Sequence, residues 1–230
     1  YIELDNYFED PESDPLTYSA ASSNTGVVTT SVSGSILRII EVSYGTAQIT
    51  VTAGDGSSLE ATDVFTVDVN GAPVVEAPLA DVSLDEGFGT STVILGNVFT
   101  DPDDNPLTFT ASSNNPGVVQ VEVSGGTLTL TEVGIGTANV TVTASDGALS
   151  VQDVFIVDIN GGPVVSAAIS DRAVNQGFGT IFIDLDNHFS DPEGDQLTYD
   201  AVTSDGGVVT VGVASNILQI NEVSHGTATI

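Results

Sequence analysis

The sequence predicts an all-β protein made of tandem seven-stranded Greek-key β-sandwiches, with the domain at each end incomplete. Three observations predict this fold class. Apolar and polar residues alternate with a period of two through most of the chain. Gly, Pro, Asn and Asp cluster between the alternating segments, as they do in turns. The same unit also recurs three times, which indicates domains arranged in tandem.

The repeat is clearest in one thirteen-residue motif. FEDPESDPLTYSA begins at Phe8, FTDPDDNPLTFTA at Phe99 and FSDPEGDQLTYDA at Phe189, which gives a period of 91 and then 90 residues. We therefore expect an N-terminally incomplete repeat over residues 1–69, a complete one over 70–159 and a C-terminally incomplete one over 160–230. Because both ends fall inside a repeat, we expect the chain to be a segment of a longer protein.

The complete repeat contains seven segments in which a β-branched or aromatic residue alternates with a polar one. We predict antiparallel strands over residues 73–84, 90–95, 106–111, 117–123, 127–132, 137–144 and 151–159. The alternation also predicts which side chains point into the core: Phe99, Leu107, Val119, Leu128, Val140, Val142, Phe155 and Val157.

The composition excludes several classes of function. The formal net charge of −30, from 32 acidic and two basic residues, disfavours nucleic acid and anionic membranes as partners and favours cations. The chain has no Cys, so it forms neither disulfides nor thiolate metal sites. It contains no apolar stretch long enough to form a membrane helix, and no G-x-S-x-G, H-E-x-x-H or phosphate-loop motif. We therefore expect a non-enzymatic protein that does not insert into a membrane.

Acidic loops recur at residues 10–14, 101–105 and 191–195, and the middle one lies between the second and third predicted strands of its unit. Alternate positions of each loop carry side-chain oxygens, which are the hard ligands that calcium requires. A solvated acidic turn is the alternative, since Asp and Asn are common turn residues. The candidate ligands in these loops are Asp10, Glu12, Asp14, Asp101, Asp103, Asp191, Glu193 and Asp195.

Three further acidic elements recur at strand ends. An Asp precedes Gly after the sixth strand, a D-x-N tripeptide ends the seventh, and a Glu ends the fifth. The residues at these positions are Asp55 and Asp146, Asp68 and Asn70, Asp158 and Asn160, and Glu41 and Glu132.

Together these elements resemble the cadherin repeat, with its Asp-x-Asp loop before L-T-Y-S, its glutamate, its V-x-A-x-D-x-G motif and its D-x-N strand end followed by proline. The resemblance covers all three units. Within the cadherin repeats, the units are most similar to the bacterial cadherin-like and dystroglycan-type repeats. It implies a cadherin-like, Ig-like sandwich in which calcium binds between consecutive domains. The residues implied at the first junction are Glu41, Asp68, Asn70, Asp101, Asp103 and Asp146. Those implied at the second are Glu86, Glu132, Asp158, Asn160, Asp191 and Glu193, while Asp10, Glu12 and Asp55 would face a preceding domain.

The chain departs from the cadherin pattern in its linkers. DVNGAP and DINGGP, which begin at Asp68 and Asp158, carry glycine where the cadherin linker D-x-N-D-N-x-P has a further acidic ligand. Glu86 is also replaced by Gln176 in the third unit. Because the loss of anionic ligands weakens calcium binding, we expect one or two calcium ions per junction.

We therefore expect a segment of an extracellular protein of bacterial type, at a cell surface or secreted, that serves as a calcium-rigidified stalk, adhesin or filament. Its expected partners are calcium ions, neighbouring repeats, identical chains in a filament, and a cell-surface or polysaccharide ligand. Two alternatives remain open: a polymer subunit that assembles head to tail by strand complementation, and a polysaccharide-binding module. Adaptation to a salt-rich habitat is a further explanation of the acidity.

Overall fold

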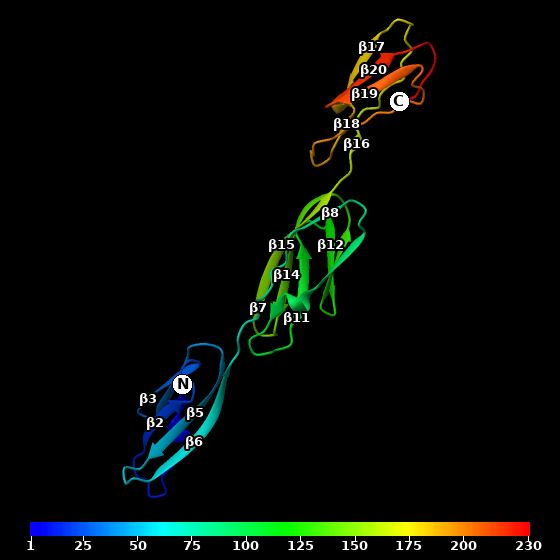
Figure 1. Ribbon diagram of the computed structural model, residues 1–230. Coiled ribbons are helices and arrows are strands. Elements are labelled where there is room, and N and C mark those ends of the chain that lie inside the picture. Colours follow the sequence, from blue (N-terminus) through cyan, green and yellow to red (C-terminus); the bar gives the residue numbers. More distant parts are fainter.

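The computed structural model describes residues 1–230 and is built almost entirely of strands. Figure 1 shows three groups of strands that follow one another along the chain, each joined to the next by a single stretch of backbone. The predicted all-β fold class is confirmed. No helix of the chain is both long and apolar enough to cross a membrane.

The middle unit is a two-sheet sandwich (Figure 1). One sheet has the strand order β11-β14-β15-β8, and the other has the order β12-β13-β9. A further pair, β10 and β7, is antiparallel. The bounds are β7 Val74–Val75, β8 Val82–Asp85, β9 Thr90–Ile94, β10 Phe99–Thr100, β11 Thr108–Ser113, β12 Val119–Ser124, β13 Thr127–Glu132, β14 Gly136–Ser145 and β15 Ser150–Asn160, with a 3₁₀ turn, η2, at Leu95–Asn97.

Two details of the strand prediction were wrong. The strand expected over residues 73–84 is split, because β7 pairs with β10 whereas β8 pairs with β15 in the main sheet. Between the two halves the Leu79 N–H donates to the Asp153 carboxylate at 2.7 Å. A side chain of β15 therefore takes the place of a backbone hydrogen bond between strands there. The pairing of β8 with β15 is also parallel, with Val82 opposite Val157, and not antiparallel as expected.

The outer units repeat parts of this arrangement. In the first, one sheet has the order β1-β4-β3 and the other the order β2-β5-β6, so β6 has no neighbour corresponding to β8. In the third, the described strands form the sheet β17-β20-β19 and the pair β16-β18. The bounds are β1 Ile2–Glu3, η1 Leu4–Asn6, β2 Thr17–Ser22, β3 Val28–Ser33, β4 Ile36–Glu41, β5 Gly45–Gly54, β6 Glu60–Val69, β16 Val164–Val165, β17 Thr180–Asp184, η3 Leu185–Asn187, β18 Phe189–Ser190, β19 Val209–Ala214 and β20 Ile217–Glu222.

The core follows the predicted alternation. The middle unit has a cluster of 14 buried apolar residues, against seven in the first unit and five in the third, so the most complete sandwich has the largest core. Seven of the eight predicted core residues of the middle unit are buried, and the eighth, Leu107, is partly buried and packs against the same cluster. No polar or charged residue is buried in the core, so the acidic residues at the strand ends lie outside it.

Candidate metal centre

The acidic loop has the same local structure in all three units. In the middle unit, Asp101 Oδ1 accepts the backbone N–H groups of Asp103 and Asn105 at 3.0 and 3.1 Å. The intervening Asp104 has a positive φ of 58°, which closes the turn. The first carboxylate of the loop therefore shapes the turn with one of its two oxygens, as Asp does in side-chain-closed turns.

The equivalent loops repeat these bonds. Asp10 Oδ1 accepts from the N–H groups of Glu12 and Asp14, and Asp191 Oδ1 accepts from those of Glu193 and Asp195. The second oxygen of each first-position carboxylate takes no part in this turn, so it is left for another partner.

A second turn, between β14 and β15, positions Asp146. Its Oδ1 accepts the backbone N–H groups of Ala148 and Leu149 at 2.7 and 2.6 Å. Asp55, its counterpart in the first unit, accepts the N–H and hydroxyl of Ser57. Both aspartates are thus fixed by the turn that follows their strand, and Asp146 keeps Oδ2 for a contact outside it.

The linker before the middle unit contacts both of these turns. The Asn70 amide donates to Asp146 Oδ2 at 2.8 Å, and the Asn105 amide donates to Asn70 Oδ1 at 2.8 Å. The next linker residue, Gly71, donates its N–H to Asp103 Oδ2 at 2.6 Å. These bonds hold the linker against the acidic end of the middle unit.

Glycine at position 71 suits this close approach, because a larger residue would press on its neighbours. An added Cβ would lie 3.0 Å from the Tyr44 Cγ atom of the preceding unit and 3.1 Å from Asp103 Oδ2 of the following one. The linker backbone is therefore packed between an aromatic ring and a carboxylate, one from each unit.

One oxygen at this end of the middle unit has no partner. Asp101 Oδ2 is buried and accepts no hydrogen bond, although Oδ1 of the same carboxylate accepts two. A buried, unpaired anionic oxygen is costly, and a cation beside it would remove that cost. The donors at this end of the unit are carboxylates and side-chain amides, which are the types that calcium prefers. The donor types present therefore fit a calcium ion.

Other predicted ligands of the first junction lie apart from this network. Asp68 accepts the Thr46 hydroxyl at 2.9 Å across the β5–β6 ladder, and Glu41 lies exposed at the end of β4. The structure brings no three His, Cys, Asp or Glu side chains together as a group that could hold a metal ion. The complete ligand sets therefore stay predictions.

The second junction repeats the linker contact. The Gly161 N–H donates to Glu193 Oε2 at 3.1 Å, and the Gly162 N–H donates to Glu86 Oε2 at 3.4 Å. Asn160 lies opposite Asp85 at the end of the parallel β15–β8 pair. Glu86, Asn160, Asp191 and Asp195 line one cleft at this junction.

Two predicted ligands of this junction have partners within the middle unit. Glu132 accepts the N–H groups of Gly87 and Gly89 at 2.8 and 2.9 Å, and these bonds hold the pKa of its carboxyl below the ordinary value. Asp158 accepts the Thr137 hydroxyl at 3.0 Å, as Asp68 does with Thr46. The four candidates of the first unit that were assigned to a preceding domain or loop, Asp10, Glu12, Asp14 and Asp55, form no side-chain hydrogen bond to another unit.

Sequence reasoning missed Asn105 and the linker glycines as parts of the junction. The signals were present: oxygen-bearing residues fill the fifth position of every acidic loop, and the Asn-Gly pair recurs in both linkers. Tyr44 and Ile135, which contact Gly71 and Gly161, occupy equivalent positions of the repeat.

The Asn70 contact predicts a specific titration behaviour for Asp146. The Asn70 amide and then the Leu149 and Ala148 N–H groups lower the pKa of this carboxyl. Because the folded-state pKa lies below the unfolded value of about 3.9, the contact stabilises the fold above that pH and its contribution is lost as pH falls through the lowered pKa. In an Asn70→Ala variant, an NMR titration of the side-chain carboxyl should show the Asp146 pKa rising.

Asp55 is the internal control for that titration, because it has the same turn but no contact with the linker. Its pKa is lowered by Ser57, so it should be unchanged in Asn70→Ala. An Asp146 pKa that also stays unchanged would show that the linker amide does not hold the carboxylate in solution.

No family model and no curated protein matches the chain. Among solved structures, a titin fragment containing domains I67–I69 matches with a TM-score of 0.51 and 9% identity, over 93% of this chain and 79% of the titin chain. Human protocadherin-24 EC1-2 matches with a TM-score of 0.40 and 14% identity, over 67% of this chain and 86% of that chain.

An endo-fucoidan hydrolase from glycoside hydrolase family 107 matches with a TM-score of 0.33 and 19% identity, over 90% of this chain. The chain spans about a third of the length of that enzyme, 34%. At these identities the likeness to the titin domains supports the fold alone, an array of Ig-like β-sandwiches.

Proposed function

We propose that the chain is a non-enzymatic segment of a long extracellular protein in which calcium, bound where consecutive units meet, holds the units in line as a stalk, adhesin or surface filament. The tandem sandwich fold supports this proposal, as does the contact of each Asn-Gly linker with an acidic loop of the following unit. The bacterial, cadherin-like character of the repeats belongs to the same proposal.

The observation that carries the proposal is the buried, unpaired Asp101 Oδ2. Asn70, Asp101, Asp103 and Asp146 would hold calcium at the first junction, with Glu41 and Asp68 contributed by the preceding unit. The corresponding set at the second junction is Glu86, Glu132, Asp158, Asn160, Asp191 and Glu193.

Calcium would supply positive charge among carboxylates that otherwise repel one another. With a formal net charge of −30, the chain has almost no cationic side chains to offset that repulsion. Because a ligand that binds only the ordered junction stabilises it by mass action, the stiffness of the segment would follow the external calcium concentration.

Calorimetric titration of calcium into the chelator-treated chain at physiological salt tests the proposal. We expect saturable binding, with a melting temperature that rises further in calcium than in matched magnesium or sodium chloride. Asp101→Asn keeps the oxygen that closes the turn and removes one anionic ligand, so it should weaken calcium binding by about tenfold, which corresponds to about 1.4 kcal/mol.

The matched control is Asp10→Asn, the same change in the loop of the first unit, which has no preceding unit in this chain. It should leave the first-junction affinity unaltered. Equal calcium affinity in Asp101→Asn and the unaltered chain, or a melting temperature that follows ionic strength alone, would contradict the proposal and favour salt adaptation.

A further inference from the structure

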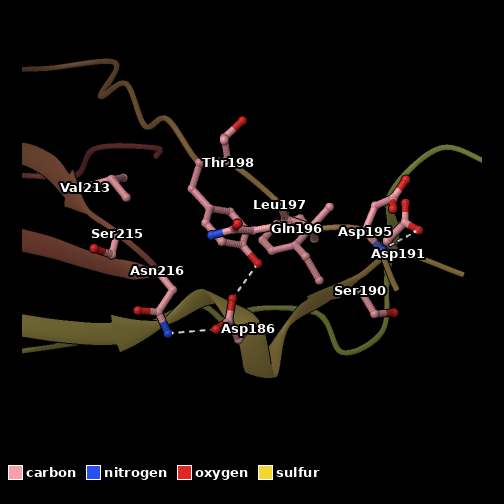
Figure 2. Close-up of a pocket in the computed structure, with 12 residues that line it drawn as sticks. Asp186, Ser190, Asp191, Asp195, Gln196, Leu197, Thr198, Val213, Ser215 and Asn216 are labelled. Carbon is pink, nitrogen blue, oxygen red and sulfur yellow. Dashed lines mark hydrogen bonds between the residues drawn. The ribbon is translucent and has the colours of Figure 1, made fainter. Parts of the chain in front are cut away.

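A polar cleft of about 640 Å³ lies on the third unit and is lined in part by Asp191 and Asp195 of the acidic loop at the second junction. Figure 2 shows Asp186 of η3 and Asn216 of the β19–β20 turn side by side and joined by a hydrogen bond, with the segment that carries Gln196 and Thr198 next to them. Its size lies within the range of about 300–1,000 Å³ typical of small-molecule sites.

Three side chains from different elements form a fixed network in this cleft. The Tyr199 hydroxyl and the Asn216 amide each donate to Asp186 at 2.8 Å, and the same Asn216 amide donates to Asp184 at 2.8 Å (Figure 2). The Tyr199 ring packs against Phe189 with the ring centroids 6.0 Å apart, so its hydroxyl is held at the cleft wall. These groups are ordered before any ligand arrives, which reduces the cost of binding.

Other polar groups of the cleft have no partner in the chain. The Gln196 amide, the Ser215 hydroxyl and the Asn216 side-chain oxygen make no hydrogen bond within the protein, and each lines the cleft. The cleft therefore presents unpaired hydrogen-bond donors and acceptors side by side. A ligand rich in hydroxyl groups, which both donate and accept, satisfies such a mixture.

The middle unit shows that the fold does not need these polar groups. With the repeat period of 90 residues, Asp186, Gln196, Tyr199, Ser215 and Asn216 correspond to Gly96, Pro106, Phe109, Gly125 and Gly126. None of these five counterparts carries a polar side chain, although the middle unit has the largest core of the three. The polar lining of the third unit is therefore an addition relative to the middle unit, while the first unit shares the Tyr–Asp bond, between Tyr18 and Asp5 at 2.7 Å, but has Pro15 and Gly34 where the third unit has Gln196 and Ser215.

We propose that this cleft binds a neutral oligosaccharide. No basic residue lines it and the chain carries a formal net charge of −30, so an anionic glycan is disfavoured. The same charge opposes a second copy of this chain as the occupant. The hydroxyl groups of the sugar satisfy Gln196, Ser215 and Asn216.

Affinity electrophoresis of the full chain through gels containing dextran, mannan, xylan or galactan tests the assignment, with alginate and heparin as anionic controls. We expect retardation by at least one neutral polysaccharide and none by the anionic ones. The triple variant Asp186→Gly, Tyr199→Phe, Asn216→Gly installs the middle unit's own residues, so the fold should tolerate it. It should weaken the retarding interaction by about tenfold or more.

A second variant keeps the test decisive if the triple variant folds poorly. Ser215→Gly changes only an exposed side chain of the cleft to the middle unit's residue and should weaken the same interaction by about threefold. Retardation that persists unchanged in both variants, absence of retardation by all four neutral polysaccharides, or retardation by alginate or heparin alone would each overturn the proposal.

Discussion

Replacing Phe155 by alanine should lower the free energy of unfolding of the middle unit by about 3–5 kcal/mol. Phe155 is 1% exposed, belongs to the 14-residue cluster and is the largest of the fully buried side chains. Its removal leaves a cavity that close-packed neighbours fill only in part. Native-state hydrogen exchange of the β14 and β15 amides measures the change, because it reports on one unit at a time.

Val154→Ala is the matched control for that experiment. Val154 precedes Phe155 in β15 but is 54% exposed on the outer face, so its truncation should cost less than about 1 kcal/mol. Similar losses in the two variants would mean that the inward face of β15 is not the core face.

The second large effect is expected at the second junction, in Gly161→Ala. The added Cβ would lie 2.9 Å from Glu193 Oε2 and 3.0 Å from Ile135 Cδ1, so the carboxylate must shift, and the shift weakens its 3.1 Å bond to the Gly161 N–H. We expect the docked linker to lose about 1–2 kcal/mol relative to undocked states, a factor of about five to thirty in population. Small-angle X-ray scattering should show a broader distribution of the distances within the molecule.

Gly162→Ala is the control, because a Cβ at Gly162 meets nothing within 4 Å and the first linker already has Ala72 at this position. The variant should scatter as the unaltered chain does. If both substitutions broaden the distribution equally, the effect comes from linker stiffness and not from the contact with Glu193.

The sequence predicted the sandwich well because period-two alternation reports directly on which side of a sheet each residue faces. Phe155 and Val157 could be assigned to the core on that basis. The same signal did not reveal that the strand expected over residues 73–84 divides into β7 and β8, because a strand that changes sheets keeps its alternating pattern.

The candidate metal centre could be predicted only as a set of positions. Repetition identified Asp101 and Asp146, but the use of one Asp101 oxygen to close a turn depends on backbone geometry that composition does not show. The Asp186–Tyr199–Asn216 network was missed for a different reason. The network lies where the third unit differs from the second, so the motifs that the repeats share did not reveal it.

The parallel pairing of β8 with β15 has a mechanical consequence. β8 lies near the start of the middle unit and β15 at its end, and the four residue pairs from Val82–Val157 to Asp85–Asn160 join them. A tension applied along the array pulls these strands in opposite directions along their own axes. The ladder between them is then loaded in shear, so its hydrogen bonds share the force and must yield together and not one after another. A unit connected in this way resists extension at the two strands through which the load enters and leaves.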